Sequence, residues 1–158
     1  MTAVILAGGR GTRLAQLHGD IPKPMAQLDG VPVLERQLRC LGAQGVREVV
    51  LVTGWLHERV EGYFGDGGRL GLRLSYITEE QPLGTAGSLF YLQNRLEKDF
   101  LLLNGDLLFD IDLARFQAAH ARTREKGGLA TILTHPNSHP YDSALVETGG
   151  EGRVTGWL

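Results

Sequence analysis

The amino-acid sequence predicts a doubly wound α/β fold, in which helices cover both faces of a mostly parallel sheet. Short apolar runs typical of buried strands alternate with segments whose apolar residues recur at helical spacing. Glycine is abundant, at 22 of 158 residues, and several glycines follow directly after an apolar run. In such folds ligands bind at the carboxyl ends of the strands, so the residues that follow each run are candidates for a functional site.

Residues 1–64 are expected to contain two strands and two helices. Residues 4–6 and 49–52 are continuous apolar runs, which predict strands buried on both faces. Over residues 33–41 apolar side chains recur at helical spacing between a proline and a glycine, which predicts an amphipathic helix. Residues 55–64 are expected to form a short helix that a glycine closes.

After residue 64 the alternation of strands and helices continues. Gly84 is expected to start a helix. Apolar spacing predicts strands at residues 72–77, 100–103 and 129–133, helices at 89–96 and 113–121, and a terminal hairpin of residues 144–147 and 154–158 around a glycine-rich turn. The whole chain, residues 1–158, is expected to be one domain.

Composition excludes several classes of function. The formal net charge is −2 with both signs interspersed, so no basic surface for nucleic acid or an anionic membrane is expected. No apolar stretch approaches the roughly 20 residues that a membrane span needs, and no basic segment precedes an apolar one as in a secretory signal. A single cysteine excludes an internal disulfide and suits a reducing compartment, so a cytoplasmic location is expected.

The first strand runs directly into the glycine-rich segment Ala7-Gly8-Gly9-Arg10-Gly11-Thr12-Arg13-Leu14. It is not the dinucleotide fingerprint, which would need glycine in place of Leu14, and it lacks the Gly-Lys-Ser/Thr of a P-loop. Glycines leave backbone N–H groups open to a ligand, and Arg10 and Arg13 add fixed positive charge and forked donors. These features predict a loop that wraps a polyphosphate.

Residues 8–14, followed by Pro22-Lys23-Pro24, resemble the signature of the sugar-1-phosphate nucleotidyltransferases. The resemblance implies a Rossmann-like sheet of the nucleotide-diphospho-sugar transferase type, with Arg13 and Lys23 as the catalytic cations. The two prolines are expected to hold Lys23 on an extended, stiff support. The nucleotide contacts that the resemblance implies are Leu6, Ala7, Gly8, Gly9, Gly11, Thr12, Glu79, Gly84 and Thr85.

Asp106 follows an apolar strand and a glycine, so its carboxylate is expected at a fixed place on the edge of the sheet. Mg²⁺ commonly takes one or two carboxylates and completes its ligands with substrate phosphates. Capping of a strand end is the structural alternative for an isolated Gly-Asp. The resemblance favours a Mg²⁺ ligand at Asp106, and a sugar contact is expected at the neighbouring Asn104.

Glu79 occupies the position, five residues before Gly84, where the wider family often reads the nucleobase with glutamine. A carboxylate accepts only, and guanine presents two adjacent donors, N1–H and the 2-amino group. Uracil presents one N–H between two carbonyl oxygens. The sequence therefore favours GTP, and Pro-Leu-Gly-Thr-Ala-Gly resembles guanylyltransferases for mannose and heptose 1-phosphates.

Residues 135–143 contain His135, His139 and Asp142, but their prolines forbid the helix that would align two histidines, so zinc is not expected. The stretch instead resembles a loop that faces the sugar in heptose 1-phosphate guanylyltransferases, which implies sugar contacts at Tyr141 and Asp142. In the resembling family a Glu-Lys-Pro segment and a second metal-binding aspartate follow later, and the sequence ends before both. Nucleotide binding with little turnover is therefore expected from this chain alone.

The sequence thus predicts a Mg²⁺-dependent enzyme that transfers a nucleotide from GTP to a heptose or mannose 1-phosphate and releases pyrophosphate. A uridylyl- or thymidylyltransferase remains the nearer alternative. A non-catalytic nucleotide-binding or regulatory module is the alternative from another class. A homo-oligomer is left open.

Overall fold

The computed structural model describes residues 1–9, 21–81, 84–93, 95–96, 99–136 and 144–157. Two compact units make up the chain, Met1–Ala114 and Arg115–Leu158. The first unit holds the central sheet and all the predicted site residues that are described.

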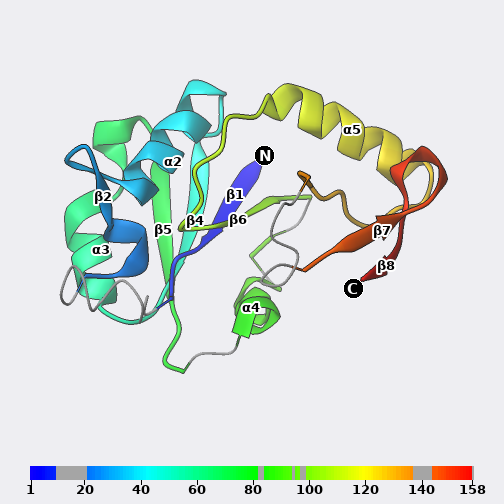
Figure 1. Cartoon of the computed structure of the whole chain (residues 1–158). Coiled ribbons are helices and arrows are strands. Elements are labelled where there is room, and N and C mark those ends of the chain that lie inside the picture. Colours follow the sequence, from blue (N-terminus) through cyan, green and yellow to red (C-terminus); the bar gives the residue numbers. More distant parts are fainter. Residues whose placement is uncertain (10–20, 82–83, 94, 97–98, 137–143, 158) are drawn as a thin grey trace. The chain divides into compact units, whose positions relative to one another are not determined.

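The central sheet has four strands, which run side by side in Figure 1. All its pairings are parallel, and the order is β5-β4-β1-β6. The strands are β1 (Thr2–Leu6), β4 (Glu48–Thr53), β5 (Arg73–Thr78) and β6 (Leu101–Asn104). Each lies within two residues of its predicted bounds, and the predicted parallel α/β sheet is confirmed.

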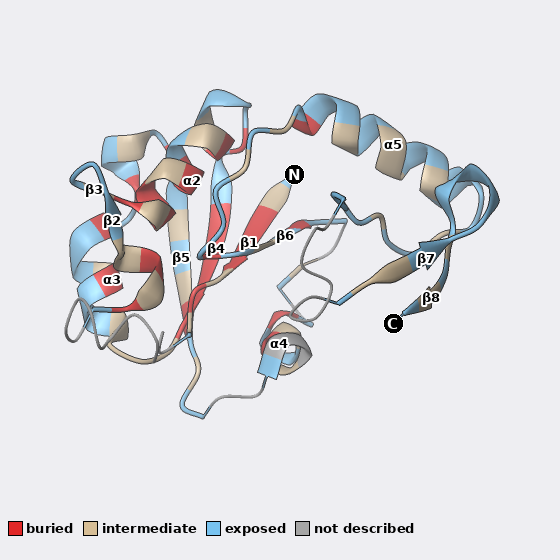
Figure 2. Ribbon diagram, viewed as in Figure 1, coloured by how far each residue is buried: buried red, intermediate tan, exposed pale blue. Residues whose placement is uncertain are grey.

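The core lies on both sides of this sheet. Figure 2 shows the buried residues gathered on β1, β4 and α2. Val4 and Val52 belong to a cluster with Ile77 and Leu92, while Ile5, which points to the opposite face of β1, is also fully buried. Continuous apolar sequence in β1 and β4 follows from this burial on two faces.

Helices α2 (Val33–Ala43) and α3 (His57–Phe64) confirm two predicted helices. The predicted helix at residues 89–96 is wrong in type and length, because the short α4 (Gly84–Gly87) leads into the 3₁₀ helix η3 (Ser88–Leu92). The start of a helix at Gly84 is confirmed.

The support of Lys23 also differs from the prediction. Pro22 is extended, but Lys23–Met25 form a 3₁₀ turn, η1, rather than an extended segment. Proline at the start of a helical turn is tolerated because its missing N–H is not needed there. A small antiparallel hairpin, β2 (Gln27–Leu28) and β3 (Val31–Pro32), then leads into α2.

Glu35 on α2 is a buried carboxylate that joins three elements. Its oxygens accept hydrogen bonds from Arg39 (2.6 and 2.9 Å), from Tyr63 on α3 (2.8 Å) and from Arg69 (2.9 Å) in the 3₁₀ turn η2 (Gly68–Leu70). The Arg69 guanidinium also lies 4.7 Å from the centre of the Tyr63 ring. The hydrogen bond from Arg69 is the main cause that lowers the pKa of Glu35 to about 2. The network fixes α2 relative to α3 and η2.

The predicted helix at residues 113–121 is confirmed as α5 (Leu113–Glu125), most of which belongs to the second unit. The predicted hairpin is confirmed as β7 (Val146–Thr148) and β8 (Val154–Trp157). The predicted strand at residues 129–133 is wrong, because no strand is assigned there. Leu129 is 85% exposed and Leu133 is 61% exposed, so this apolar run lacks the packing and the ladder partner that a strand needs. No described helix is both long enough and apolar enough to cross a membrane.

Candidate active site

The strand order reverses at β1, which marks the carboxyl end of this strand as a candidate binding position. The chain passes from β1 to β4 and β5 on one side, then returns to β6 on the other side of β1. Ligands of open α/β sheets bind where the order reverses in this way. The segments that leave the sheet here are residues 7–9 after β1 and residues 105–106 after β6.

Gly105 allows these two segments to approach each other. Its backbone N–H donates to the carbonyl oxygen of Leu6 at 2.8 Å. A Cβ at this position would lie 3.0 Å from that oxygen and 3.2 Å from the Cα of Ala7. Only glycine fits such a contact without displacement of the backbone, so Gly105 brings the following residue, Asp106, to the start of the glycine-rich loop.

Lys23 and Asp106 form an ion pair, from Nζ to Oδ2, across 83 residues of sequence. Their side chains are 41% and 33% exposed, so both charged groups remain open to solvent and to a ligand. Lys23 belongs to η1, and Asp106 lies two residues after the end of β6. The structure therefore joins a predicted catalytic cation to the predicted metal ligand.

Glu79 lies against the glycine-rich loop on the other side of β1. Its backbone N–H donates to the carbonyl oxygen of Thr53 at 2.8 Å, which guides the chain from β5 across the end of β4. Oε1 of Glu79 accepts from Ser88 Oγ at 2.8 Å. Oε2 lies so near Gly8 that a Cβ there would be 2.8 Å away. Glycine at position 8 thus makes room for the Glu79 carboxylate, a role beyond the predicted contact with a ligand.

The other predicted site residues divide into two groups. Leu6 ends β1, Ala7 is buried beyond it, Gly9 has open space beside its Cα, and Gly84 begins α4 with a φ of +73°. Asn104 accepts a hydrogen bond through its backbone oxygen. Outside the described residues lie Gly11, Thr12, Arg13, Tyr141 and Asp142, and the side chain of Thr85 is not described either.

The Nucleotidyl transferase family model matches residues 2–157. The chain belongs to this family. It is 38% identical to mannose-1-phosphate guanylyltransferase of Mycobacterium tuberculosis, over 99% of this chain and 43% of that protein. It is 41% identical to D-glycero-alpha-D-manno-heptose 1-phosphate guanylyltransferase of Campylobacter jejuni, over 74% of this chain and 52% of that protein.

Relatives with another nucleotide in their names also match. The chain is 34% identical to UTP--glucose-1-phosphate uridylyltransferase of Synechocystis sp., over 98% of this chain and 42% of that protein.

The crystal structure of HddC from Yersinia pseudotuberculosis complexed with GMP-PN matches with a TM-score of 0.75 at 25% identity, over 99% of this chain and 68% of that chain. The nucleotidyl transferase chain thus spans about half the length of these curated relatives.

The oxygen-bearing side chains of the site fit a hard divalent cation only in part. Asp106 supplies one partly exposed carboxylate, next to an ammonium group that balances its charge. Within the described ranges no group of three or more His, Cys, Asp or Glu side chains could hold a metal ion. One carboxylate with substrate phosphate oxygens is nevertheless a common set of ligands for Mg²⁺.

Sequence reasoning missed three buried polar residues that support this candidate site, namely Gln37, Thr53 and Ser88. Ser88 binds Glu79, Thr53 receives the backbone N–H of that glutamate, and Gln37 binds the turn that carries Asp106. A signal existed for Gln37 alone, since it stands three residues after Leu34 on the apolar face of a predicted helix.

Proposed function

We propose that this chain forms the nucleotide-binding part of a Mg²⁺-dependent guanylyltransferase that uses GTP and a mannose or heptose 1-phosphate. The observation that carries the proposal is the Lys23–Asp106 ion pair beside the glycine-rich loop, at the reversal point of the sheet. A cation and a carboxylate that share one open edge suit chemistry on phosphate groups, where charge must be neutralised at fixed positions.

The proposed reaction joins the two substrates without a protein nucleophile. An oxygen of the sugar 1-phosphate attacks the α-phosphorus of GTP, and the bond from that phosphorus to the oxygen that bridges to the β-phosphate breaks. Pyrophosphate leaves with the electron pair of this bond, and a GDP-sugar is formed. Mg²⁺, when bound, would neutralise phosphate charge.

Each residue has a separate part in this scheme. The backbone N–H groups of the loop after β1, with Arg13, bind the polyphosphate. Lys23 approaches the α-phosphate, where it offsets the charge that gathers during attack. Asp106 would hold the Mg²⁺ through its partly exposed carboxylate. Asn104, Tyr141 and Asp142 are proposed contacts of the sugar.

The preference for guanine rests on Glu79. One of its oxygens is fixed by Ser88 and the other lies against Gly8, so the carboxylate is held at the loop in one orientation. A carboxylate oxygen has two lone pairs, so the bond from Ser88 leaves acceptor capacity for guanine N1–H and the 2-amino group. Similarity to a uridylyltransferase favours UTP as the second candidate.

Pyrophosphate release across a panel tests the proposal. GTP, UTP and dTTP are each combined with mannose, heptose and glucose 1-phosphates at fixed Mg²⁺, and the same nucleotides are titrated in binding experiments. Release with GTP and a mannose or heptose 1-phosphate supports the proposal. Release only with UTP or dTTP overturns the assignment of GTP and makes UTP or dTTP the proposed nucleotide substrate. Tight GTP binding with no release in any combination supports a non-catalytic nucleotide-binding module.

A further inference from the structure

Gln37 is a polar side chain on the buried face of α2. It is 1% exposed, and its neighbours on the same face, Leu34, Leu38 and Leu41, are fully buried. Burial of an amide is costly unless hydrogen bonds replace its contacts with water. The hydrogen bonds that Gln37 makes therefore indicate what this residue does in the core.

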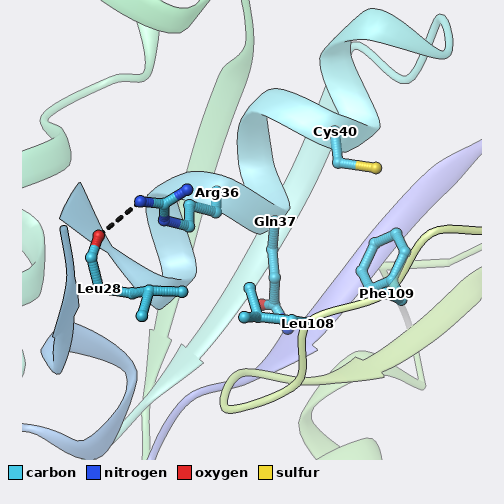
Figure 3. A pocket seen from close by; sticks show the side chains of 6 residues that line it. All are labelled: Leu28, Arg36, Gln37, Cys40, Leu108 and Phe109. Atoms are coloured by element: carbon cyan, nitrogen blue, oxygen red, sulfur yellow. Dashed lines mark hydrogen bonds between the residues drawn. The ribbon is translucent and has the colours of Figure 1, made fainter.

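Both donors of the Gln37 amide go to one turn. Nε2 donates to the backbone oxygen of Asn104 at 2.8 Å and also to the backbone oxygen of Leu107. These two carbonyl groups bracket Gly105 and Asp106, so a single amide group clamps both ends of the turn. Figure 3 shows Gln37 reaching from α2 to the segment that contains Leu108.

Apolar packing does little to fix this turn. Leu107 is 47% exposed and Leu108 is 55% exposed, so neither leucine is anchored in the core. A pocket opens on this side of the turn, lined by Leu28, Arg36, Gln37, Cys40, Leu108 and Phe109. The contact between Gly105 and Leu6 holds the side of the turn that faces β1, and the hydrogen bonds from Gln37 hold the side that faces α2.

The same helix also supports Lys23. The backbone N–H of Val33, the first residue of α2, donates to the oxygen of Ala26 at 2.9 Å, directly after the 3₁₀ turn that contains Lys23. Both members of the ion pair are therefore tied to α2 within its first turn and a half. We propose that Gln37 is a positioning residue, which holds the 104–107 turn so that Asp106 meets Lys23 and a divalent cation in one geometry.

The part of this inference that concerns the cation rests on the proposed function. The test therefore has two measurements, of which the first does not depend on that function. The variants are Gln37→Met, which keeps length and flexibility but lacks donors, and Gln37→Leu, which is a compact apolar side chain that also lacks donors. In the 105–108 segment the amide of Gly105 is protected by its hydrogen bond to Leu6, and its hydrogen–deuterium exchange should become on the order of tenfold to a hundredfold faster, as expected for the loss of the two hydrogen bonds from Gln37. Exchange in β1 and β4 should remain slow.

The second measurement is pyrophosphate release as a function of Mg²⁺. In both variants the apparent Mg²⁺ constant should rise and kcat should fall, each about tenfold, while KM for GTP stays within twofold, because Glu79 and the glycine-rich loop are not touched. Gln44→Leu is the matched control. It removes another glutamine of this region, whose Oε1 accepts from the backbone N–H of Leu113 at 2.8 Å, away from Asp106.

The outcomes separate the two ideas. Faster exchange confined to residues 105–108 supports positioning by Gln37, even where the unmutated chain releases no pyrophosphate and the proposed function fails. Unchanged exchange of these amides in a folded variant overturns the inference. So does faster exchange throughout the sheet, because Gln37 would then contribute to overall stability alone. An unchanged Mg²⁺ constant in an active variant also overturns it.

Discussion

Ser88 Oγ donates a hydrogen bond of 2.8 Å to Oε1 of Glu79, and both residues belong to the first compact unit. Ser88 is 4% exposed, so this bond is shielded from water. A carboxylate held in this way presents its remaining lone pairs in a fixed direction, which is the requirement for reading the edge of a base. The first two predictions test this pair.

Glu79→Gln should lower the ratio of GTP affinity to UTP affinity. The glutamine replaces one acceptor oxygen with an NH₂ group, which would face a guanine donor and leave it unpaired at a cost of about 1–3 kcal/mol. GTP affinity should fall by about one to two orders of magnitude, while UTP affinity should hold or improve. Titration of GTP and UTP against both proteins measures the ratio. Glu80→Gln, an exposed neighbour, is the control, and an unchanged ratio in Glu79→Gln removes Glu79 from base recognition.

Ser88→Ala should weaken the same preference by a smaller factor. The carboxylate keeps its charge but loses the donor that orients it, so GTP affinity should fall about threefold to tenfold. The same titration, combined with thermal unfolding, distinguishes orientation from stability. A lower Tm with the GTP-to-UTP ratio intact would show that Ser88 only stabilises the turn from α4 into η3, since its Oγ also lies 3.3 Å from the carbonyl oxygen of Gly84.

Asp106→Asn should abolish Mg²⁺-dependent turnover and leave the fold intact. A neutral amide is a poor ligand for a hard cation, and the partly exposed position tolerates the change in charge. Pyrophosphate release over a range of Mg²⁺ concentrations measures the effect. Asp110→Asn, in the same loop and exposed, provides the matched control. Undiminished activity of Asp106→Asn at saturating Mg²⁺ would assign Asp106 a structural role.

Lys23→Met should have opposite effects on metal binding and on turnover. Loss of the ammonium group frees Asp106, so affinity for Mg²⁺ without nucleotide should rise, by up to about fivefold for an exposed ion pair. Turnover should fall, because the charge at the α-phosphate is no longer offset. Calorimetric titration of Mg²⁺ and pyrophosphate release are the two measurements. Lys126→Met, which breaks the pair with Glu151 at 2.6 Å, should change neither. A weaker affinity for Mg²⁺ in Lys23→Met contradicts this prediction.

The Glu35 network should make the free energy of unfolding depend on pH in the acid range. The pKa of Glu35 is lowered from 4.5 to about 2, so the ionised carboxylate stabilises the fold fully above pH 4.5. This contribution, on the order of 3 kcal/mol, is lost as the pH falls through about 2. In Glu35→Gln the free energy of unfolding should be lower at pH 7 and should vary less between pH 5 and 2. Urea unfolding at several pH values measures this. Glu125→Gln, an exposed control, should follow the unmutated chain, and an equally steep loss in Glu35→Gln would assign the acid dependence to other groups.

Two of the predictions that failed concern segments whose local sequence fits more than one structure. Residues 129–133 have the apolar composition of a strand, yet a strand forms only where another strand supplies hydrogen bonds, and neighbouring sequence does not reveal that partner. Lys23 was expected on an extended segment, although prolines fit the start of a 3₁₀ turn equally well. Local propensity did not decide either case.

The sequence by itself determined the α/β class, the central strands and which residues stand at the strand ends, because periodicity is a local property of the chain. Tertiary structure alone decided which of these residues meet. Lys23 contacts Asp106 because β6 returns beside β1 and Gly105 allows the close approach. Ser88 and Gln37 acquire their roles in the same way, since a buried polar side chain binds whatever partner folding places beside it.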